Sequence, residues 1–359
     1  MNSTTIAKLV ETYKLPKFRG AQLRKAFFEQ QVTKFQDVST LSLPMRQTLA
    51  AEQRVLSFDT EAVFKASDGR AYKALLLLPD GNRIETVLLN PKPGLWSCCI
   101  SSQVGCGLAC TFCATGKLGL SRNLTAEEIS DQVLFWRQYI CQQRLDARLS
   151  NVVYMGMGEP MQNRREVFAS LTELMNPDTF GIGARHLSVS TVGLVKPMKE
   201  FTDQFPQVNL ALSLHAANDT LRERLMPVNK SQPLAALREA LQYHADETNR
   251  KIFLEYILLS GENDSAEHAE ELVRYVRSVD RPALLHTNLI VYNPTDSDHQ
   301  ASARERARAF RDQLEAAGLS VTIRRNLGRD IDAACGQLAL KAGETPGYSP
   351  SAESSPASL

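Results

Sequence analysis

The chain has 359 residues, of which 43% are hydrophobic and 23% are charged, and its net charge is +1. This length and composition indicate a globular protein with a substantial core. No run of about eighteen apolar residues is present, and residues 1–9 lack the apolar stretch of a secretory signal, so the sequence predicts a cytoplasmic protein without membrane association.

Residues 1–53 form the first region, and they predict a small helical module. Apolar residues recur there at helical spacing, at Leu23, Phe27, Phe28, Phe35, Val38 and Leu41. The first 35 residues hold seven Lys or Arg against two Glu. A basic end on a nearly neutral protein fits either a contact with a phosphate backbone or a solvated helix face, and the charge alone leaves both open.

Residues 54–92 predict a short antiparallel sheet that links this module to the rest of the chain. Short alternating segments are interrupted at Asp68-Gly69 and Asp80-Gly81, which are dipeptides typical of tight hairpin turns. At the other end of the chain, residues 343–359 are rich in Ser, Pro, Ala and Gly, which predicts a disordered tail.

Residues 93–342 alternate short apolar strands with helices. The predicted strands are Trp96 to Ile100, Asn151 to Met155, His186 to Thr191, Val208 to Leu214, Ile252 to Leu258, Leu285 to Val291 and Leu319 to Ile323. One helix is expected to begin after Thr125, because Thr125 and Glu128 have the spacing of a capping box. About six strand–helix repeats predict an α/β fold with a partial (βα)6 barrel, whose chemistry lies on the loops after the strands.

Five of the seven cysteines lie within residues 98–113. In a chain without a secretory signal, this clustering favours metal binding or catalysis over structural disulfides. Cys106, Cys110 and Cys113 follow the first barrel strand with C-x3-C-x2-C spacing. Three thiolates can bind three irons of a 4Fe-4S cluster and leave the fourth iron open. A zinc site completed by a histidine and a set of buried free thiols are the alternatives.

Here the sequence resembles the radical S-adenosylmethionine (SAM) superfamily. Met155-Gly156-Met157-Gly158-Glu159-Pro160 follows the second barrel strand and is similar to the superfamily loop that contacts the amino group of SAM. Within the superfamily, the chain resembles the RlmN/Cfr family of ribosomal RNA adenine methyltransferases, and the Cfr-like branch somewhat more. The segments that carry this resemblance are Cys99 to Cys106, Ser213-Leu214-His215, Tyr292-Asn293-Pro294 and Asp330 to Leu338.

The resemblance implies three catalytic residues. Cys335 would carry a methyl group, Glu85 would accept a proton from the adenine ring, and Cys99 would form a disulfide with Cys335 to release the product. Each has an alternative: Cys335 as a small buried side chain, and Glu85 as a cross-strand charge partner. Neighbouring side chains on a strand face opposite ways, so only one of Cys98 and Cys99 can face the site.

The resemblance also implies the cofactors and their contacts. The cofactors are a 4Fe-4S cluster on Cys106, Cys110 and Cys113, and SAM, used twice per turnover. The implied SAM contacts are Gly158, Glu159, Ser190, Ser213, Leu214, His215 and Asn293. A capping or core role is the alternative for His215.

The substrate implied by the resemblance is an adenosine in the peptidyl transferase region of 23S rRNA. Methylation of carbon 8 and of carbon 2 both remain open, and the electron donor would be a flavodoxin or a ferredoxin. Two other hypotheses remain: a radical SAM enzyme that acts on another RNA such as tRNA, and a non-catalytic metal-binding module.

Overall fold

The computed structural model describes residues 1–145, 148–295, 297–338 and 340. The predicted disordered tail, residues 343–359, lies outside the described residues. Within the described ranges, no helix has both the length and the apolar character needed to cross a membrane.

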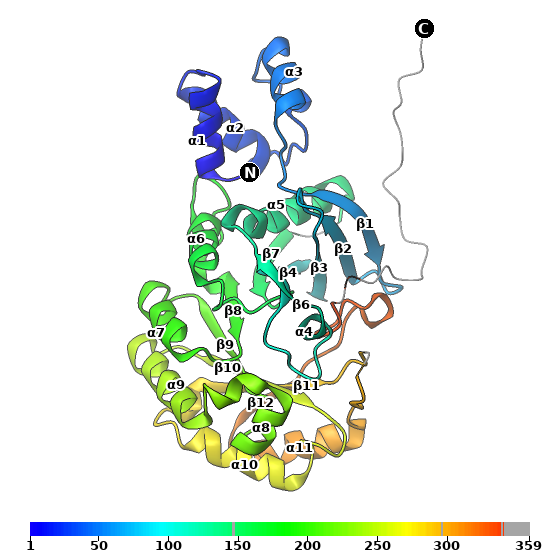
Figure 1. Ribbon diagram of the computed structural model, residues 1–359, viewed down its shortest axis with the longest axis vertical. Coiled ribbons are helices and arrows are strands. Elements are labelled where there is room, and N and C mark those ends of the chain that lie inside the picture. The colour runs from blue at the N-terminus through cyan, green and yellow to red at the C-terminus, as the bar shows by residue number, and fades with distance from the viewer. Residues whose placement is uncertain (146–147, 296, 339, 341–359) are drawn as a thin grey trace.

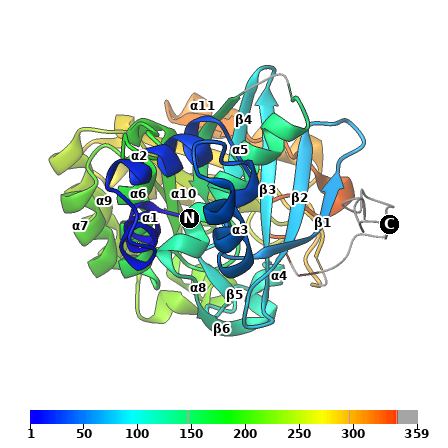
Figure 2. The same cartoon turned by 90° about the horizontal axis from the view of Figure 1, so that it is seen from above.

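The N-terminal helices lie together at one end of the molecule (Figure 1). They are α1 (Ser3–Thr12), α2 (Phe18–Arg24), a π-helical turn (Lys25–Glu29), a 3-10 turn (Phe35–Asp37) and α3 (Leu43–Glu52). Seen from above, they lie over the region of α5 (Ala126–Gln142) (Figure 2). The ring centroids of Phe28 and Phe180 are 4.9 Å apart, and the Gln138 amide donates a 2.9 Å hydrogen bond to the Val32 carbonyl. The core of this predicted helical module is therefore continuous with that of the barrel.

The predicted antiparallel strands form one edge of a ten-stranded sheet. They are β1 (Asp59–Lys65), β2 (Ala71–Leu77) and β3 (Arg83–Lys92), and β3 pairs antiparallel with β4 (Leu95–Cys99). The two predicted hairpin turns are present, and their glycines, Gly69 and Gly81, have positive φ angles of 68° and 83°. Asp68 and Asp80 each accept a hydrogen bond from the backbone N–H two residues later, as Asx turns do.

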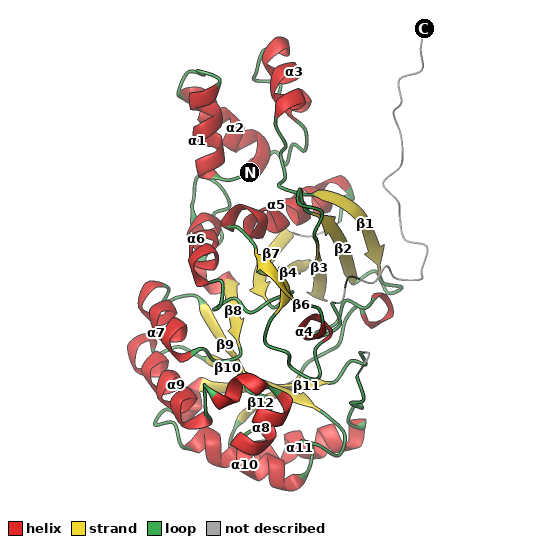
Figure 3. Cartoon of the chain, viewed as in Figure 1, coloured by secondary structure: helices red, strands yellow, loops and turns green. Residues whose placement is uncertain are grey.

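The remaining strands are parallel and confirm the α/β barrel. In sheet order after β4 they are β7 (Arg148–Tyr154), β8 (Leu187–Thr191), β9 (Asn209–Ser213), β10 (Ile252–Leu258), β11 (Leu285–Val291) and β12 (Ser320–Ile323). The helices after them are α6 (Arg164–Met175), α7 (Val195–Gln204), α8 (Asp219–Leu225), α9 (Leu234–Thr248), α10 (Ala266–Arg277) and α11 (Arg304–Ala316). Six helical crossovers thus join seven strands, and the helices cover the outside of the sheet (Figure 3).

The crossover from β4 to β7 contains an additional hairpin. It consists of β5 (Gln103–Cys106), the short helix α4 (Ala114–Lys117) and β6 (Gly119–Asn123), and α5 follows. The predicted capping box begins α5: the Thr125 hydroxyl accepts from the Glu128 N–H at 3.2 Å, and the Glu128 carboxylate accepts from the Thr125 N–H at 2.9 Å. The hairpin and α4 therefore place the cysteine loop at the carboxyl end of the barrel strands.

Candidate functional site

A pocket lies at the carboxyl ends of the parallel strands. Its lining residues include residues that end or follow β5, β7, β8, β9 and β12 and residues near the ends of β10 and β11, as expected for a site on an α/β barrel. Of the residues predicted from the sequence, those that line it are Cys106, Cys110, Cys113, Gly158, Glu159, Ser190, Ser213, His215 and Cys335. Residues from distant parts of the chain thus share one cavity.

The three cysteines Cys106, Cys110 and Cys113 lie on one side of this pocket. Cys106 ends β5, and Cys113 precedes the first residue of α4. Gly105 permits the close approach of β5 and β6, because a Cβ atom there would lie 1.9 Å from the carbonyl oxygen of Gly119. Burial raises the pKa of all three thiols, and for Cys106 the value reaches about 11.

This donor set fits an iron–sulfur cluster. The three thiols are close enough to raise one another's pKa, and thiolates are the ligands that such clusters use. Bound iron would supply the positive charge that these buried thiols need in order to ionise. Three protein ligands would leave one iron of such a cluster without a protein ligand.

The loop after β7 approaches the neighbouring backbone closely. A Cβ atom on Gly156 would lie 2.7 Å from the Ile100 carbonyl group, and Gly158 has a φ of 96°. Glu159 follows, and its carboxylate accepts 3.0 Å hydrogen bonds from the N–H groups of Met161 and Val192. Burial raises the pKa of Glu159 to about 7. The carboxylate is thus fixed in the pocket wall, where it can receive an ammonium group.

Polar side chains at the ends of β8 and β9 also line the pocket. The hydroxyl oxygens of Ser190 and Ser213 are 3.4 Å apart. His215 has a left-handed backbone, with φ 58°, and its Nδ1 accepts a 3.1 Å hydrogen bond from the Ile257 N–H. Burial, followed by the charge of Arg222, lowers the pKa of His215 to about 3. The imidazole is therefore neutral at pH 7, with its proton on Nε2.

Two of the predicted SAM contacts, Leu214 and Asn293, do not line the pocket, and the Leu214 side chain belongs to the hydrophobic core. Its backbone is fixed instead: the Leu214 N–H donates to the Glu255 carbonyl at 3.0 Å. The fully buried Arg222 donates to the carbonyl groups of Leu214, Ser213 and Val192. This arginine holds the ends of β8 and β9 together, and the sequence analysis did not find it.

The loop that carries Cys335 is hydrogen-bonded to the cysteine loop. The Ala114 N–H donates to the Gly336 carbonyl at 2.9 Å, and the Thr115 hydroxyl donates to the Leu338 carbonyl at 2.7 Å. Asn293, which follows β11, is fully buried, and its amide donates to the Cys335 carbonyl at 3.3 Å. Cys335 itself is exposed, which is not the environment of a small core residue.

The adjacent cysteines at the end of β4 face in opposite directions. Cys98 is completely buried and is influenced by the charge of Arg137 on α5. Cys99 is half-buried, and burial followed by the nearby thiol of Cys335 raises its pKa to about 12. The charge of Arg324 opposes this increase. Of the two thiols, Cys99 therefore lies near Cys335.

Two charged residues of the pocket were missed by the sequence analysis. Glu255 lies on β10, and Arg324 follows β12; the Arg324 guanidinium is 3.0 Å from the Glu255 carboxylate. The Asn288 amide donates to the same carboxylate at 2.9 Å. The sequence offered one indication of this ion pair: Glu255 stands within the otherwise apolar strand Ile252–Leu258, and a buried charge needs a partner.

Glu85 lies on β3 and does not line the pocket. Its side chain is fully buried and forms a 3.0 Å ion pair with Lys73 of β2. The Glu85 carboxylate also accepts a 3.2 Å hydrogen bond from the Leu340 N–H. The cross-strand charge contact that was the alternative for Glu85 is thus present, and Leu340 contacts the carboxylate.

Comparisons with known proteins agree with this arrangement. Residues 100–276 match the model of the radical SAM superfamily. The chain is 43% identical over 338 residues to the ribosomal RNA large subunit methyltransferase Cfr of Lachnoclostridium phytofermentans, covering 93% of this chain and 96% of that protein. This chain is a member of the Cfr/RlmN family of radical SAM methyltransferases.

Two further proteins of this kind are similar over nearly their whole length. The probable dual-specificity RNA methyltransferase RlmN of Listeria monocytogenes is 40% identical over 340 residues, covering 94% of this chain and 92% of that protein. The crystal structure of a radical SAM methyltransferase from Sphaerobacter thermophilus superposes with a TM-score of 0.88 at 36% identity, covering 94% of this chain and 97% of that one. Membership in the family implies a 4Fe-4S cluster and SAM as cofactors, and the chain is an enzyme.

Proposed function

We propose that the protein methylates carbon 8 or carbon 2 of an adenosine in the peptidyl transferase region of 23S rRNA, by way of a methylated Cys335. The observation that carries this proposal is the position of Cys335 in the same pocket as Cys106, Cys110 and Cys113. Its relatives are named ribosomal RNA methyltransferases, which supports an RNA substrate.

The cluster on these three cysteines would supply the electron that cleaves SAM to a 5'-deoxyadenosyl radical. Two molecules of SAM would be used per turnover: one would methylate the Cys335 thiol, and the other would supply the radical that removes a hydrogen atom from that methyl group. Glu159 would hold the SAM ammonium group, with Gly158 beside it, and Ser190, Ser213, the neutral His215 and Asn293 would contact the rest of the molecule. A flavodoxin or a ferredoxin would supply the electrons.

After the methylene group has bonded to the adenine carbon, two residues would complete the reaction. The radical adduct would return one electron to the cluster, and Glu85 would take the ring proton. Cys99 would then attack the sulfur of Cys335, forming a disulfide, and the methylene carbon would leave with the electron pair and take up a proton as the methyl group of the released base. The position of Cys99 beside Cys335 supports the second step. The buried carboxylate of Glu85 requires movement of the segment that includes Leu340 before it can meet the base.

The N-terminal module, residues 1–53, would bind RNA around the target. The Phe18 side chain is 57% exposed on α2, next to the exposed Lys17. The Arg19 guanidinium lies 4.9 Å from the Phe18 ring centroid. An exposed aromatic ring among cations suits both base stacking and phosphate contacts. The target adenosine would leave its stacked position to reach the pocket, as in other enzymes that modify bases.

The proposal is tested by methyl transfer with anoxically purified enzyme, comparing 23S rRNA, tRNA and protein as substrates. Mass spectrometry of the methylated nucleoside identifies the carbon. Transfer RNA is included because one relative is named a dual-specificity RNA methyltransferase. The proposal would be overturned if the enzyme methylated neither of the two RNAs.

The same assay tests the two catalytic cysteines. Cys335→Ala should abolish methylation, whereas Cys99→Ala should accumulate a covalent protein–RNA adduct, visible as a shifted band on a denaturing gel. Cys141→Ala is the matched control, because Cys141 is an exposed thiol on α5, remote from the pocket. Normal turnover by Cys99→Ala would exclude the disulfide step.

A further inference from the structure

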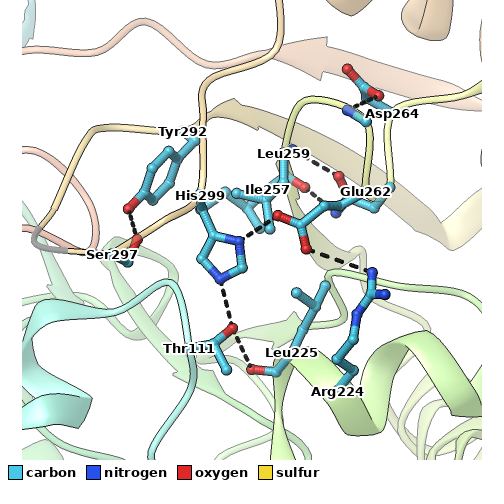
Figure 4. A network of polar contacts seen from close by, with 12 residues as sticks. Thr111, Arg224, Leu225, Ile257, Leu259, Glu262, Asp264, Tyr292, Ser297 and His299 are labelled. Atoms are coloured by element: carbon cyan, nitrogen blue, oxygen red, sulfur yellow. Dashed lines mark hydrogen bonds and ion pairs between the residues drawn. The ribbon is translucent and has the colours of Figure 1, made fainter.

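His299 lies in the loop between β11 and α11 and contacts two other loops. Its Nδ1 pairs with the carboxylate of Glu262, which follows β10. Its Nε2 is 2.8 Å from the hydroxyl oxygen of Thr111. Figure 4 shows the imidazole between these two side chains. The His299 side chain is 14% exposed; its contact with Glu262 is partly buried, and its contact with Thr111 lies at the surface.

The Thr111 contact reaches the cysteine loop. Thr111 lies between Cys110 and Cys113, the second and third cysteines of the triplet. Its N–H donates to the Leu225 carbonyl at 3.0 Å, which fixes the backbone of this segment against the end of α8. A contact with the Thr111 hydroxyl therefore acts on the segment that determines the separation of two cluster ligands.

Glu262 orients the imidazole. An ionised carboxylate only accepts hydrogen bonds, so Nδ1 of His299 must donate to it, which leaves Nε2 for Thr111. The Arg224 guanidinium lies 3.6 Å from the other Glu262 oxygen and adds a cationic contact (Figure 4). The Glu262 N–H donates to the Leu259 carbonyl at 3.2 Å. The carboxylate is thus held on an ordered turn.

The loop that carries His299 also carries Asn293, the predicted SAM contact. Tyr292 lies beside Asn293, and its hydroxyl oxygen is 2.6 Å from the Ser297 hydroxyl oxygen. The rings of Tyr292 and His299 meet edge to face, with their centroids 6.2 Å apart. These contacts connect the Asn293 end of the loop to the imidazole, and the imidazole to the cysteine loop.

We propose that His299, oriented by Glu262, is a positioning residue that fixes the cysteine loop relative to the Asn293 loop, and so sets the geometry in which SAM meets the open iron. This inference rests on the proposed cluster site, but not on the identity of the RNA or of the carbon methylated. A purely structural role would affect only folding and cluster content. A positioning role affects SAM binding at full cluster content.

The test uses the full-length protein, reconstituted without oxygen, and three readouts: iron and sulfide per chain, the SAM dissociation constant, and the change in the cluster's electron paramagnetic resonance spectrum on adding SAM. His299→Ala should retain the cluster, weaken SAM binding about three- to tenfold, as expected for the loss of one hydrogen bond, and reduce the spectral change. Thr111→Val should have the same effect, since valine keeps the shape and lacks the hydroxyl.

Two comparisons make the test specific. The double variant His299→Ala/Thr111→Val should bind SAM as tightly as either single variant does, because each substitution removes the same contact. His299→Gln keeps a polar group near the Nε2 position and should restore part of the affinity. His286→Ala is the matched control: His286 lies at the start of β11, and its ring nitrogen contacts the Ser320 hydroxyl at 2.7 Å. That variant should bind SAM as the wild type does.

Three outcomes would overturn the proposal. The first is a His299→Ala protein with normal SAM affinity and a normal spectral response. The second is an additive loss in the double variant, which would mean that the two residues act separately. The third is a wild-type protein that assembles no 4Fe-4S cluster, which would also remove the proposed cluster site. Normal cluster and SAM binding without RNA methylation would instead contradict only the proposed substrate.

Discussion

Glu159 makes SAM binding dependent on pH in a range where an ordinary glutamate is fully ionised. Burial raises its pKa from 4.5 to about 7, and only the ionised carboxylate can pair with the SAM ammonium group. From pH 7.5 to pH 6.0, the ionised fraction falls from roughly three quarters to roughly one tenth. Over the same pH range the amino group of SAM, with a pKa of about 7.8, becomes more fully protonated. This favours binding by only about 1.5-fold, and so offsets only part of the loss. We therefore expect SAM affinity to fall about sixfold.

The same shift has a consequence for the ligand-free protein. Since the folded-state pKa of Glu159 is raised, the folded protein binds the proton more tightly than the unfolded chain does. The contribution of Glu159 to the free energy of unfolding is therefore largest below pH 4.5, where its carboxyl group is protonated. This contribution is lost as the pH rises through about 7, by roughly 3 kcal/mol in total. An ammonium group in the pocket offsets that cost, so SAM should stabilise the protein more at pH 7.5 than at pH 6.0.

The assay is equilibrium binding of SAM to the reconstituted protein at the two pH values, with cluster content measured in each sample. Glu159→Gln is the control: the amide cannot ionise, so binding should be weak at both pH values and should lack the loss at pH 6.0. Wild-type affinity that is unchanged or stronger at pH 6.0, with the cluster intact, would refute the role of Glu159 as the ammonium partner.

Two further predictions concern stability. Gly156→Ala should lower the free energy of unfolding by about 1–3 kcal/mol, because its Cβ would lie 2.7 Å from the backbone carbonyl of Ile100. Gly183→Ala is the control: the nearest atom to its Cβ would be 3.6 Å away, so the free energy of unfolding should change by less than about 0.5 kcal/mol. Lys73→Met should cost about 3–5 kcal/mol, because it removes the partner of the buried Glu85 carboxylate, and Lys73→Met/Glu85→Gln should recover much of the loss. Denaturant unfolding measures the stability of all these variants. Equal losses in the two glycine variants would contradict the predicted close contact at Gly156, and no recovery in the double variant would contradict the predicted cost of an unpaired Glu85 carboxylate.

Local sequence patterns were sufficient for the main elements of the barrel. β10 and β11 have the predicted bounds, Ile252–Leu258 and Leu285–Val291, because each is a short segment rich in aliphatic residues, although Glu255 interrupts the first and polar residues 286–288 interrupt the second. The start of α5 followed from its capping box. The β5–β6 hairpin was missed, since β6 (Gly119–Asn123) is short and largely exposed, and so lacks an apolar pattern.

The contacts between loops could not be predicted in this way. Arg222 is a charged residue on a short helix, and nothing in its neighbourhood in the sequence indicates that it would be fully buried among carbonyl groups of two strand ends. The pairing of Arg324 with Glu255 joins residues 69 positions apart. Such contacts depend on the order of strands in the sheet, which periodicity does not specify.

The position of Glu85 shows why a residue's role and its accessibility are separate questions. The sequence resemblance suggests that it accepts a proton, but its carboxylate is fully buried, paired with Lys73 and bound to the Leu340 N–H. Leu340 lies five residues after Cys335, on the loop that also binds the cysteine loop through Thr115. In the proposed mechanism, Glu85 would meet the base only after its contact with the Leu340 N–H is broken, so the proposed proton transfer would require Leu340 to move away from the carboxylate.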